Sequence, residues 1–127
     1  MAVIMIDLDQ FKRVNDNRGH LQGDQVLQSV AEALRRSTRE VDVAGRYGGD
    51  EFVIVLPDTN QDEGRVAGNR FVTAIREVGM KYDAVRPVTA SAGLSIARPG
   101  DTVEAVLKRA DDFAYSAKSK GGNRLCG

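Results

Sequence analysis

Apolar and polar positions along the chain predict four strands. Residues 2–6 are uniformly apolar, which is typical of a buried strand. Apolar runs at 41–47 and 52–56 flank Gly48 and Gly49, and this arrangement predicts a β-hairpin. Residues 88–96 alternate between apolar and small polar side chains, as in a strand with one buried face.

The same pattern predicts three helices. Apolar residues recur every three or four positions at 26–34, 67–78 and 103–117. Asp24 suits the N-cap of the first helix, and Gly121 with Gly122 suits the end of the third. The stretch from about residue 9 to 22 is rich in Asn, Asp, Gly and Lys and is predicted to be a polar loop.

The order β-α-β-β-α-β-α predicts an α+β fold: a ferredoxin-like, nucleotidyl-cyclase palm-type sheet, rich in antiparallel pairs, with helices packed on one face. A right-handed crossover makes the second strand parallel to the first. The end of the first strand, the hairpin turn and the end of the third helix should then meet at one edge. The abrupt apolar start suggests a chain cut from a longer protein just before a central strand.

Composition narrows the possible functions. With 127 residues, 42% hydrophobic and 28% charged, the chain is predicted to be one globular domain. Eighteen basic residues balance eighteen acidic ones, which argues against binding of bulk nucleic acid but permits single nucleotides. The single cysteine, Cys126, excludes a disulfide framework and fits a cytoplasmic setting.

Four carboxylates are predicted to converge at the shared edge: Asp7, Asp9, Asp50 and Glu51. Converging carboxylates repel one another unless a cation lies between them, and hard oxygen ligands select Mg²⁺ or Mn²⁺ shared with substrate phosphates. The alternative is that they are solvated acids at strand ends.

Several other residues near this edge have both a functional and a structural interpretation. Gly48 and Gly49 form either a simple tight turn or a backbone that a phosphate can approach closely. Asn15 and Asp24 offer the donors and acceptors that complement a guanine edge, although Asp24 is equally suited to cap a helix. Lys118 is placed to meet a phosphate or to remain an ordinary surface lysine.

Two segments resemble a known family. Arg46-Tyr47-Gly48-Gly49-Asp50-Glu51-Phe52 is similar to the signature of the GGDEF domain, the catalytic domain of bacterial diguanylate cyclases. Residues 7–16, followed by Gly19-His20 and Gly23-Asp24, resemble the second main motif of that family. The resemblance covers residues 1–127 and implies that two GTP molecules are joined into cyclic di-GMP with release of pyrophosphate.

The resemblance also implies residue roles. Metal ligands would be Asp7, Asp50 and the Leu8 carbonyl, with Glu51 a further acid at the reacting centre. Guanine would be recognised by Asn15 and Asp24. The phosphates would contact the segment 9–12, which includes Phe11 and Lys12, together with Gly48, Gly49 and Lys118. Because each domain would hold one GTP, a homodimer would be needed for catalysis.

A product-inhibition site is implied at a separate position. Arg39 and Asp42 fit the family's R-x-x-D pattern, and Arg70 could add to it. Six residues at ~3.3 Å each place Asp42 roughly 20 Å from the hairpin turn, at the opposite end of the second strand. Cyclic di-GMP would then be both product and inhibitor, and sensory or receiver domains would be partners in the parent protein.

The chain also departs from the family pattern. The helix and D-x-L-T-x-L-x-N-R segment that usually precede the domain are absent, and Gly122 occupies a position where the family often has Arg. Two other functions remain open: a weak or inactive module that senses GTP or cyclic di-GMP, and a cyclase that makes a mixed dinucleotide. The intact acids of the signature favour the cyclase, and Asp24 favours guanine on both sides.

Overall fold

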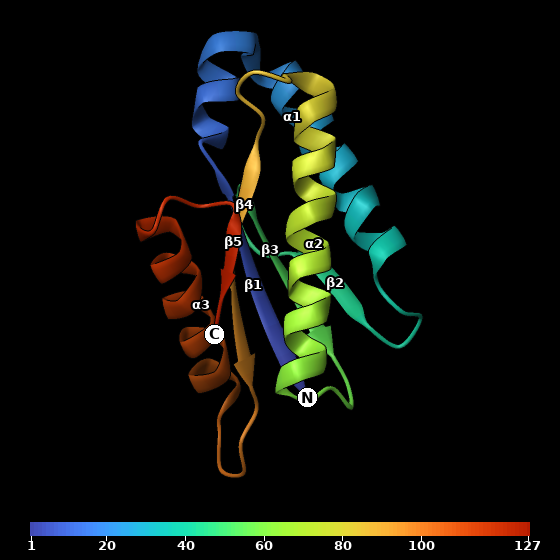
Figure 1. The fold of residues 1–127 in the computed structure, drawn as a ribbon, viewed down its shortest axis with the longest axis vertical. Helices are drawn as coiled ribbons and strands as arrows, with labels where there is room; N and C mark the ends of the chain where they lie inside the picture. The colour runs from blue at the N-terminus through green and yellow to red at the C-terminus, as the bar shows by residue number, and fades with distance from the viewer.

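A five-stranded sheet forms the centre of the molecule, in the order β2-β3-β1-β4-β5 (Figure 1). The computed structural model describes residues 1–127. The strands are β1 (Ala2–Asp9), β2 (Val43–Arg46), β3 (Glu51–Leu56), β4 (Thr89–Ile96) and β5 (Arg124–Cys126). The helices are α1 (Phe11–Ser37), α2 (Gln61–Tyr82) and α3 (Val103–Ser119). The predicted α+β architecture is confirmed.

Three of the four strand pairs are antiparallel. Strand β1 pairs antiparallel with both β3 and β4, and β2 pairs antiparallel with β3. As predicted, β2 therefore runs parallel to β1, with β3 between them. The exception is β5, which pairs parallel with β4 and was not predicted. Its three residues are too few to show a periodicity, so only the pairing with β4 defines it as a strand.

Helices cover both faces of the sheet, so the prediction that all of them lie on one face is wrong (Figure 1). Alternate residues of β1 point to opposite faces. Ile4, Ile6 and Leu8 belong to the large core that also contains buried residues of α1 and α2. Val3 and Met5 belong to a smaller core with α3. Because β1 is apolar on both faces, it accommodates helices on each side.

Both α2 and α3 begin at capped residues. The Asn60 side chain accepts a hydrogen bond from the Glu63 amide (2.9 Å), and the Glu63 carboxylate accepts one from the Asn60 amide (3.1 Å). The Thr102 hydroxyl accepts from the amide of Ala105 at the start of α3 (3.1 Å). These caps satisfy amides that have no partner within the helix and therefore fix where each helix starts.

The prediction of a polar loop at 9–22 is wrong, because most of this stretch belongs to helix α1. The helix begins at Phe11, after Gln10 in a left-handed conformation (φ 57°), and is interrupted at Gly19 (φ 85°, ψ 166°). Asp24 consequently lies inside the helix rather than at its N-cap. Phe11 is buried, and Val14, one turn later, packs against the core. These two contacts hold a helical segment whose other residues are largely polar and exposed, which explains why its composition indicated a loop.

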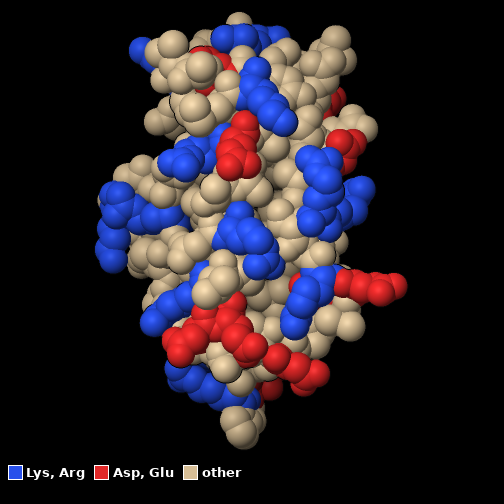
Figure 2. Space-filling view, turned by 45° about the vertical axis from the view of Figure 1, so that its right-hand side comes forward, with Lys and Arg blue, Asp and Glu red and all other residues tan.

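Charged side chains of both signs intermingle on the face of the molecule that carries α2 (Figure 2). No helix is long and apolar enough to span a membrane.

Candidate active site

Three carboxylates crowd the edge where β1 ends and β3 begins. Asp7 lies directly opposite Glu51 in the antiparallel register, and the Leu8 amide donates to the Asp50 carbonyl at 3.1 Å. Burial and the nearby Asp7 charge raise the pKa of Asp50 above its ordinary value. Burial raises the pKa of Glu51 as well, with further contributions from Asp7 and from Asp111 of α3. Ionising these carboxylates therefore costs more than it does in water, and a cation beside them would reduce that cost.

Lys118 reaches the cluster from the last turn of α3. Its Nζ donates to Asp7 Oδ2 at 2.9 Å. Burial opposes the charge on Lys118, but the hydrogen bond and charge of Asp7 outweigh it and raise the pKa of Lys118. A permanently charged ammonium group is thus available beside the carboxylates at neutral pH.

Asp9 was predicted to join this cluster, but its carboxylate is hydrogen-bonded elsewhere. Its carboxylate accepts hydrogen bonds from Thr89 Oγ1 (2.7 Å), Ser91 Oγ (2.6 Å) and the Asn123 amide (2.9 Å). Asp9 is paired with β4, at Thr89, whereas Asp7 is also paired with β3, at Glu51. The two acids of this motif therefore have different surroundings despite their spacing of two residues.

The hairpin turn is held by Arg46, a residue that was not among the predicted site residues. Its Nε donates to the carbonyls of Gly48 and Gly49, at 3.1 Å each, and its Nη2 donates to the Gly49 carbonyl. A Cβ at Gly48 would lie 2.9 Å from the Glu51 carboxylate, whereas Gly49 has open space beside it. A basic residue next to a Gly-Gly turn was the available sequence signal, because turn carbonyls need donors.

A cavity of about 390 Å³ brings together most of the predicted substrate-binding residues. It is lined by Phe11, Lys12, Asn15, Asp24, Gly49 and Asp50, together with His20, Leu27 and Arg46. Asn15 lies over Gly23, where a Cβ would overlap its amide oxygen. Gly23 is therefore required for the position that Asn15 takes in the cavity. We call this space the nucleotide pocket, after the ligand that the family resemblance implies.

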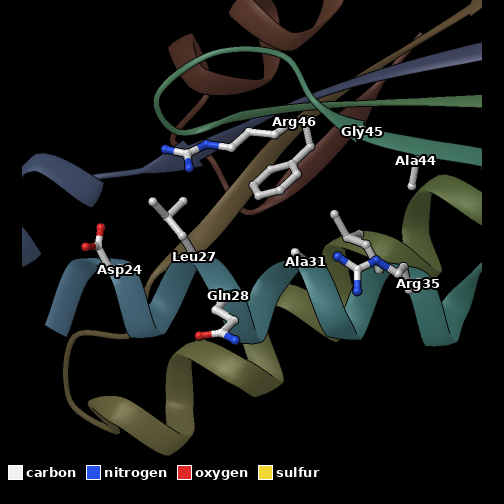
Figure 3. Close-up of a pocket in the computed structure, with 10 residues that line it drawn as sticks. Asp24, Leu27, Gln28, Ala31, Arg35, Ala44, Gly45 and Arg46 are labelled. Carbon is white, nitrogen blue, oxygen red and sulfur yellow. The ribbon is translucent and has the colours of Figure 1, made fainter. Parts of the chain in front are cut away.

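The nucleotide pocket adjoins a groove of about 470 Å³ between α1 and β2 (Figure 3). Asp24, Leu27 and Arg46 line both spaces. From these residues the groove runs along α1 past Ala31 to Arg35 (Figure 3). Its lining is apolar in the middle and charged at both ends.

A third cavity, of about 240 Å³, contains the residues predicted to form an inhibitory site. Arg39, Asp42 and Arg70 all line it. Arg39 donates to both Asp42 oxygens (2.8–3.2 Å), to the Pro57 carbonyl (3.0 Å) and to Thr59 Oγ1 (3.0 Å). Burial disfavours ionisation of Asp42, but the hydrogen bonds from Arg39 outweigh it and lower the pKa of Asp42. Arg39 therefore also fastens the α1–β2 link to the β3–α2 connection.

The acidic edge has the donors that a divalent cation requires, although no three His, Cys, Asp or Glu side chains form a complete metal site by themselves. The carboxylates of Asp7 and Asp50 are hard oxygen donors, and Asp7 raises the pKa of Asp50 by its charge. A cation between them would relieve this repulsion and would complete its coordination with phosphate oxygens and water. The residues thus fit a metal that is shared with a nucleotide.

Comparisons with known proteins agree with this geometry. Residues 1–124 match the family described as diguanylate cyclase, GGDEF domain. Diguanylate cyclase DgcP of Pseudomonas aeruginosa is 39% identical over 126 residues, which cover 98% of this chain and 19% of DgcP. The chain thus spans about a fifth of that relative's length.

Two solved structures are similar over 98% of the chain. Diguanylate cyclase SiaD of Pseudomonas aeruginosa, crystallised with its activator SiaC, has a TM-score of 0.89 and 35% identity, with 48% of that chain covered. The GGDEF domain of DgcB from Caulobacter crescentus, in complex with c-di-GMP, has a TM-score of 0.81 and 29% identity, with 75% of that chain covered. The sequence motifs, the palm-type sheet and these matches together show that the chain belongs to the GGDEF domain family of diguanylate cyclases.

Proposed function

We propose that this domain catalyses the condensation of two GTP molecules into cyclic di-GMP and pyrophosphate. The observation that carries the proposal is the nucleotide pocket, in which Asn15 and Asp24 line the same cavity as Asp50 and Gly49. Groups suited to a guanine base and groups suited to phosphates are therefore within reach of one bound nucleotide.

Base recognition falls to Asn15 and Asp24. The Asp24 carboxylate would accept from the N1–H and N2–H₂ groups of guanine, and the Asn15 amide offers both a donor and an acceptor. Leu27 supplies an apolar surface in the same cavity. Adenine lacks donors at these positions and would leave the carboxylate without partners, so the pocket should prefer GTP.

The phosphates would lie between the start of α1 and the hairpin turn. Lys12 and Gly49 line the nucleotide pocket, and Lys118 lies beyond it at Asp7. Gly48 and Gly49 have no Cβ to obstruct a close approach, and Arg46 holds their carbonyls in place. A rigid turn with neighbouring ammonium groups would orient the triphosphate without a rearrangement at the moment of reaction.

Mg²⁺ or Mn²⁺ would be held by the carboxylates of Asp7 and Asp50 and by the Leu8 carbonyl. When bound, the metal would neutralise charge on the reacting phosphate and lower the pKa of a nearby hydroxyl. Lys118 would offset the remaining negative charge at Asp7. Glu51, a carboxylate with a raised pKa, would lie at the reacting centre as an additional acid.

A homodimer follows from the stoichiometry of the reaction. One nucleotide pocket per domain serves one GTP, so the second GTP would be presented by a facing domain. Sensory or receiver domains elsewhere in the parent protein would control that pairing.

We further propose that the cavity at Arg39, Asp42 and Arg70 binds cyclic di-GMP and inhibits the enzyme. Arg70 is the better residue to test. It is exposed, donates to the Ser37 carbonyl (3.1 Å) and stacks over Phe71 (5.3 Å), whereas Arg39 bridges two segments. Arg70→Ala should raise the product concentration that halves the initial rate, by about tenfold for one lost guanidinium contact. Unchanged inhibition would exclude Arg70 from the site.

The decisive experiment is incubation of the protein with GTP and Mg²⁺, followed by mass spectrometry of the products. The wild-type protein should form cyclic di-GMP and pyrophosphate, and Asp50→Ala should lower the rate by about 100-fold or more while leaving the melting temperature near that of the wild type. GTP binding without product would instead support the sensing module. Near-normal turnover by Asp50→Ala would remove Asp50 from the metal site.

A further inference from the structure

Asp9 joins three parts of the chain through one carboxylate. Its Oδ1 accepts from the Ser91 hydroxyl, and its Oδ2 accepts from the Thr89 hydroxyl and the Asn123 amide. The hydroxyls belong to β4, and Asn123 lies between α3 and β5. Two carboxylate oxygens with three short hydrogen bonds have little capacity left for a metal ion.

The segment that Asp9 contacts ends the helix that carries Lys118. The Gly121 amide donates to the Lys118 carbonyl (3.1 Å), and the Gly122 amide donates to the Ala117 carbonyl (3.0 Å). These two bonds close the end of α3 in the manner of a Schellman motif. The next amide, that of Asn123, donates to Asp9. We call residues 120–123 the C-terminal turn.

Gly122 is needed for this contact. It is buried, has φ 75°, and a Cβ built on it would lie 2.5–2.9 Å from the Asp9 carboxylate. A larger side chain would be strained at this φ, and either the Asp9 carboxylate or the turn would have to move to make room for its Cβ.

We propose that Asp9 is a positioning residue which fastens the C-terminal turn to β4 and thereby holds Lys118 against Asp7. The inference rests on the proposed cyclase function, in which Lys118 contacts a phosphate. The two acids of the Asp7-Leu8-Asp9 motif then have different roles. Asp7 is a proposed metal ligand at the acidic edge, whereas Asp9 acts through the position of α3.

Asp9→Ala and Asp9→Asn distinguish this role from metal binding. An asparagine amide oxygen can still accept from Thr89 and Asn123, and its NH₂ group can donate to the Ser91 hydroxyl. The positioning role therefore predicts that Asp9→Asn retains most of the wild-type kcat/KM for GTP, whereas Asp9→Ala loses about tenfold. Loss of a metal ligand would instead impair both variants and raise the Mg²⁺ concentration needed for half-maximal rate.

Hydrogen exchange of the nucleotide-free protein tests the fastening without relying on catalysis. Amides of residues 121–126 should exchange about tenfold faster in Asp9→Ala and in Gly122→Ala than in the wild type. Asp62→Ala, which removes an exposed acid without a hydrogen-bond partner in α2, should leave exchange in this segment unchanged. Unchanged exchange in folded Asp9→Ala would overturn the proposal, even if the protein proves to have no cyclase activity.

A double-mutant cycle tests whether Asp9 acts through Lys118. In a Lys118→Met background, Asp9→Ala should change kcat/KM by less than about twofold, because the group that it positions is already absent. Additive losses would show that Asp9 affects the reaction by another route and would refute the link to Lys118. If no variant or wild-type protein makes product, the proposed cyclase function fails, while the exchange data still decide whether Asp9 fastens the turn.

Discussion

Replacing Lys118 with methionine tests the charge balance at the acidic edge. The substitution keeps a long apolar side chain but removes the ammonium group that donates to Asp7 at 2.9 Å. The side chains of Lys118 and Asp7 are 43% and 33% exposed, so water and salt screen their attraction substantially. The substitution should therefore weaken the interaction with bound substrate much more than it destabilises the fold.

The size of the effect follows from one lost contact between charged groups. A hydrogen bond to a charged partner contributes about 1.5–3 kcal/mol when protected from water. Discounted for the exposure of Lys118, the expected loss is about 1–2 kcal/mol, or a 5- to 30-fold decrease in kcat/KM for GTP. The melting temperature should stay within about 2 °C of the wild type, since an exposed ion pair stabilises the fold only slightly.

The assay is the initial rate of pyrophosphate release as a function of GTP concentration at saturating Mg²⁺. Lys120→Met is the matched control, because Lys120 lies two residues away, is exposed and has no ion-pair partner. Equal kcat/KM values for the two variants would reduce Lys118 to a surface ion-pair partner of Asp7. A large decrease in melting temperature for Lys118→Met alone would show that the lysine supports the fold.

The remaining predictions concern base preference, packing and acid stability. Asp24→Ala should lower the GTP-to-ATP ratio of kcat/KM by about tenfold or more, because the acceptor for the guanine N1–H and N2–H₂ groups is lost; an unchanged ratio would remove Asp24 from base recognition. Gly93→Ala should lower the free energy of unfolding, measured in urea, by about 1–3 kcal/mol, because the new Cβ would overlap backbone atoms of α3. Gly45→Ala is the control and should have little effect, since position 45 has open space beside it. Equal effects of the two substitutions would refute the close packing at Gly93. Arg39 lowers the pKa of Asp42, so the stabilisation by this carboxylate is present above the ordinary pKa of an aspartate and should be lost as the pH falls through the lowered folded-state pKa. Unfolding free energies measured between pH 2 and 7 should therefore fall less steeply with acid in Asp42→Asn, and parallel curves would contradict the assignment.

The sequence by itself determined four of the five strands, the hairpin turn and the edge at which the site lies. Residues 2–6 and 52–56 are apolar runs whose burial is favourable wherever a partner strand is available, so local pattern is enough to find them. The handedness of the β-α-β crossover then fixed which ends meet, and the structure places Lys118 at Asp7 as that rule requires. The signature at 46–52 likewise identified the family from neighbouring residues alone.

The tertiary structure decided features whose partners are distant in sequence. The helix at the start of α1 depends on Phe11 and Val14 reaching the core, and β5 exists because β4 offers it an edge. The opposite placement of α3 depends on which face of β1 it packs against, and periodicity does not encode that choice.

The same limit applies within the site. Asp7 and Asp9 are both acids near the end of one apolar strand, and no local pattern separates them. Their roles differ because Lys118 donates to Asp7, whereas Thr89, Ser91 and the turn after α3 donate to Asp9. A carboxylate's chemistry depends on the donors and charges around it, and those are supplied here by segments at least 80 residues away in the chain.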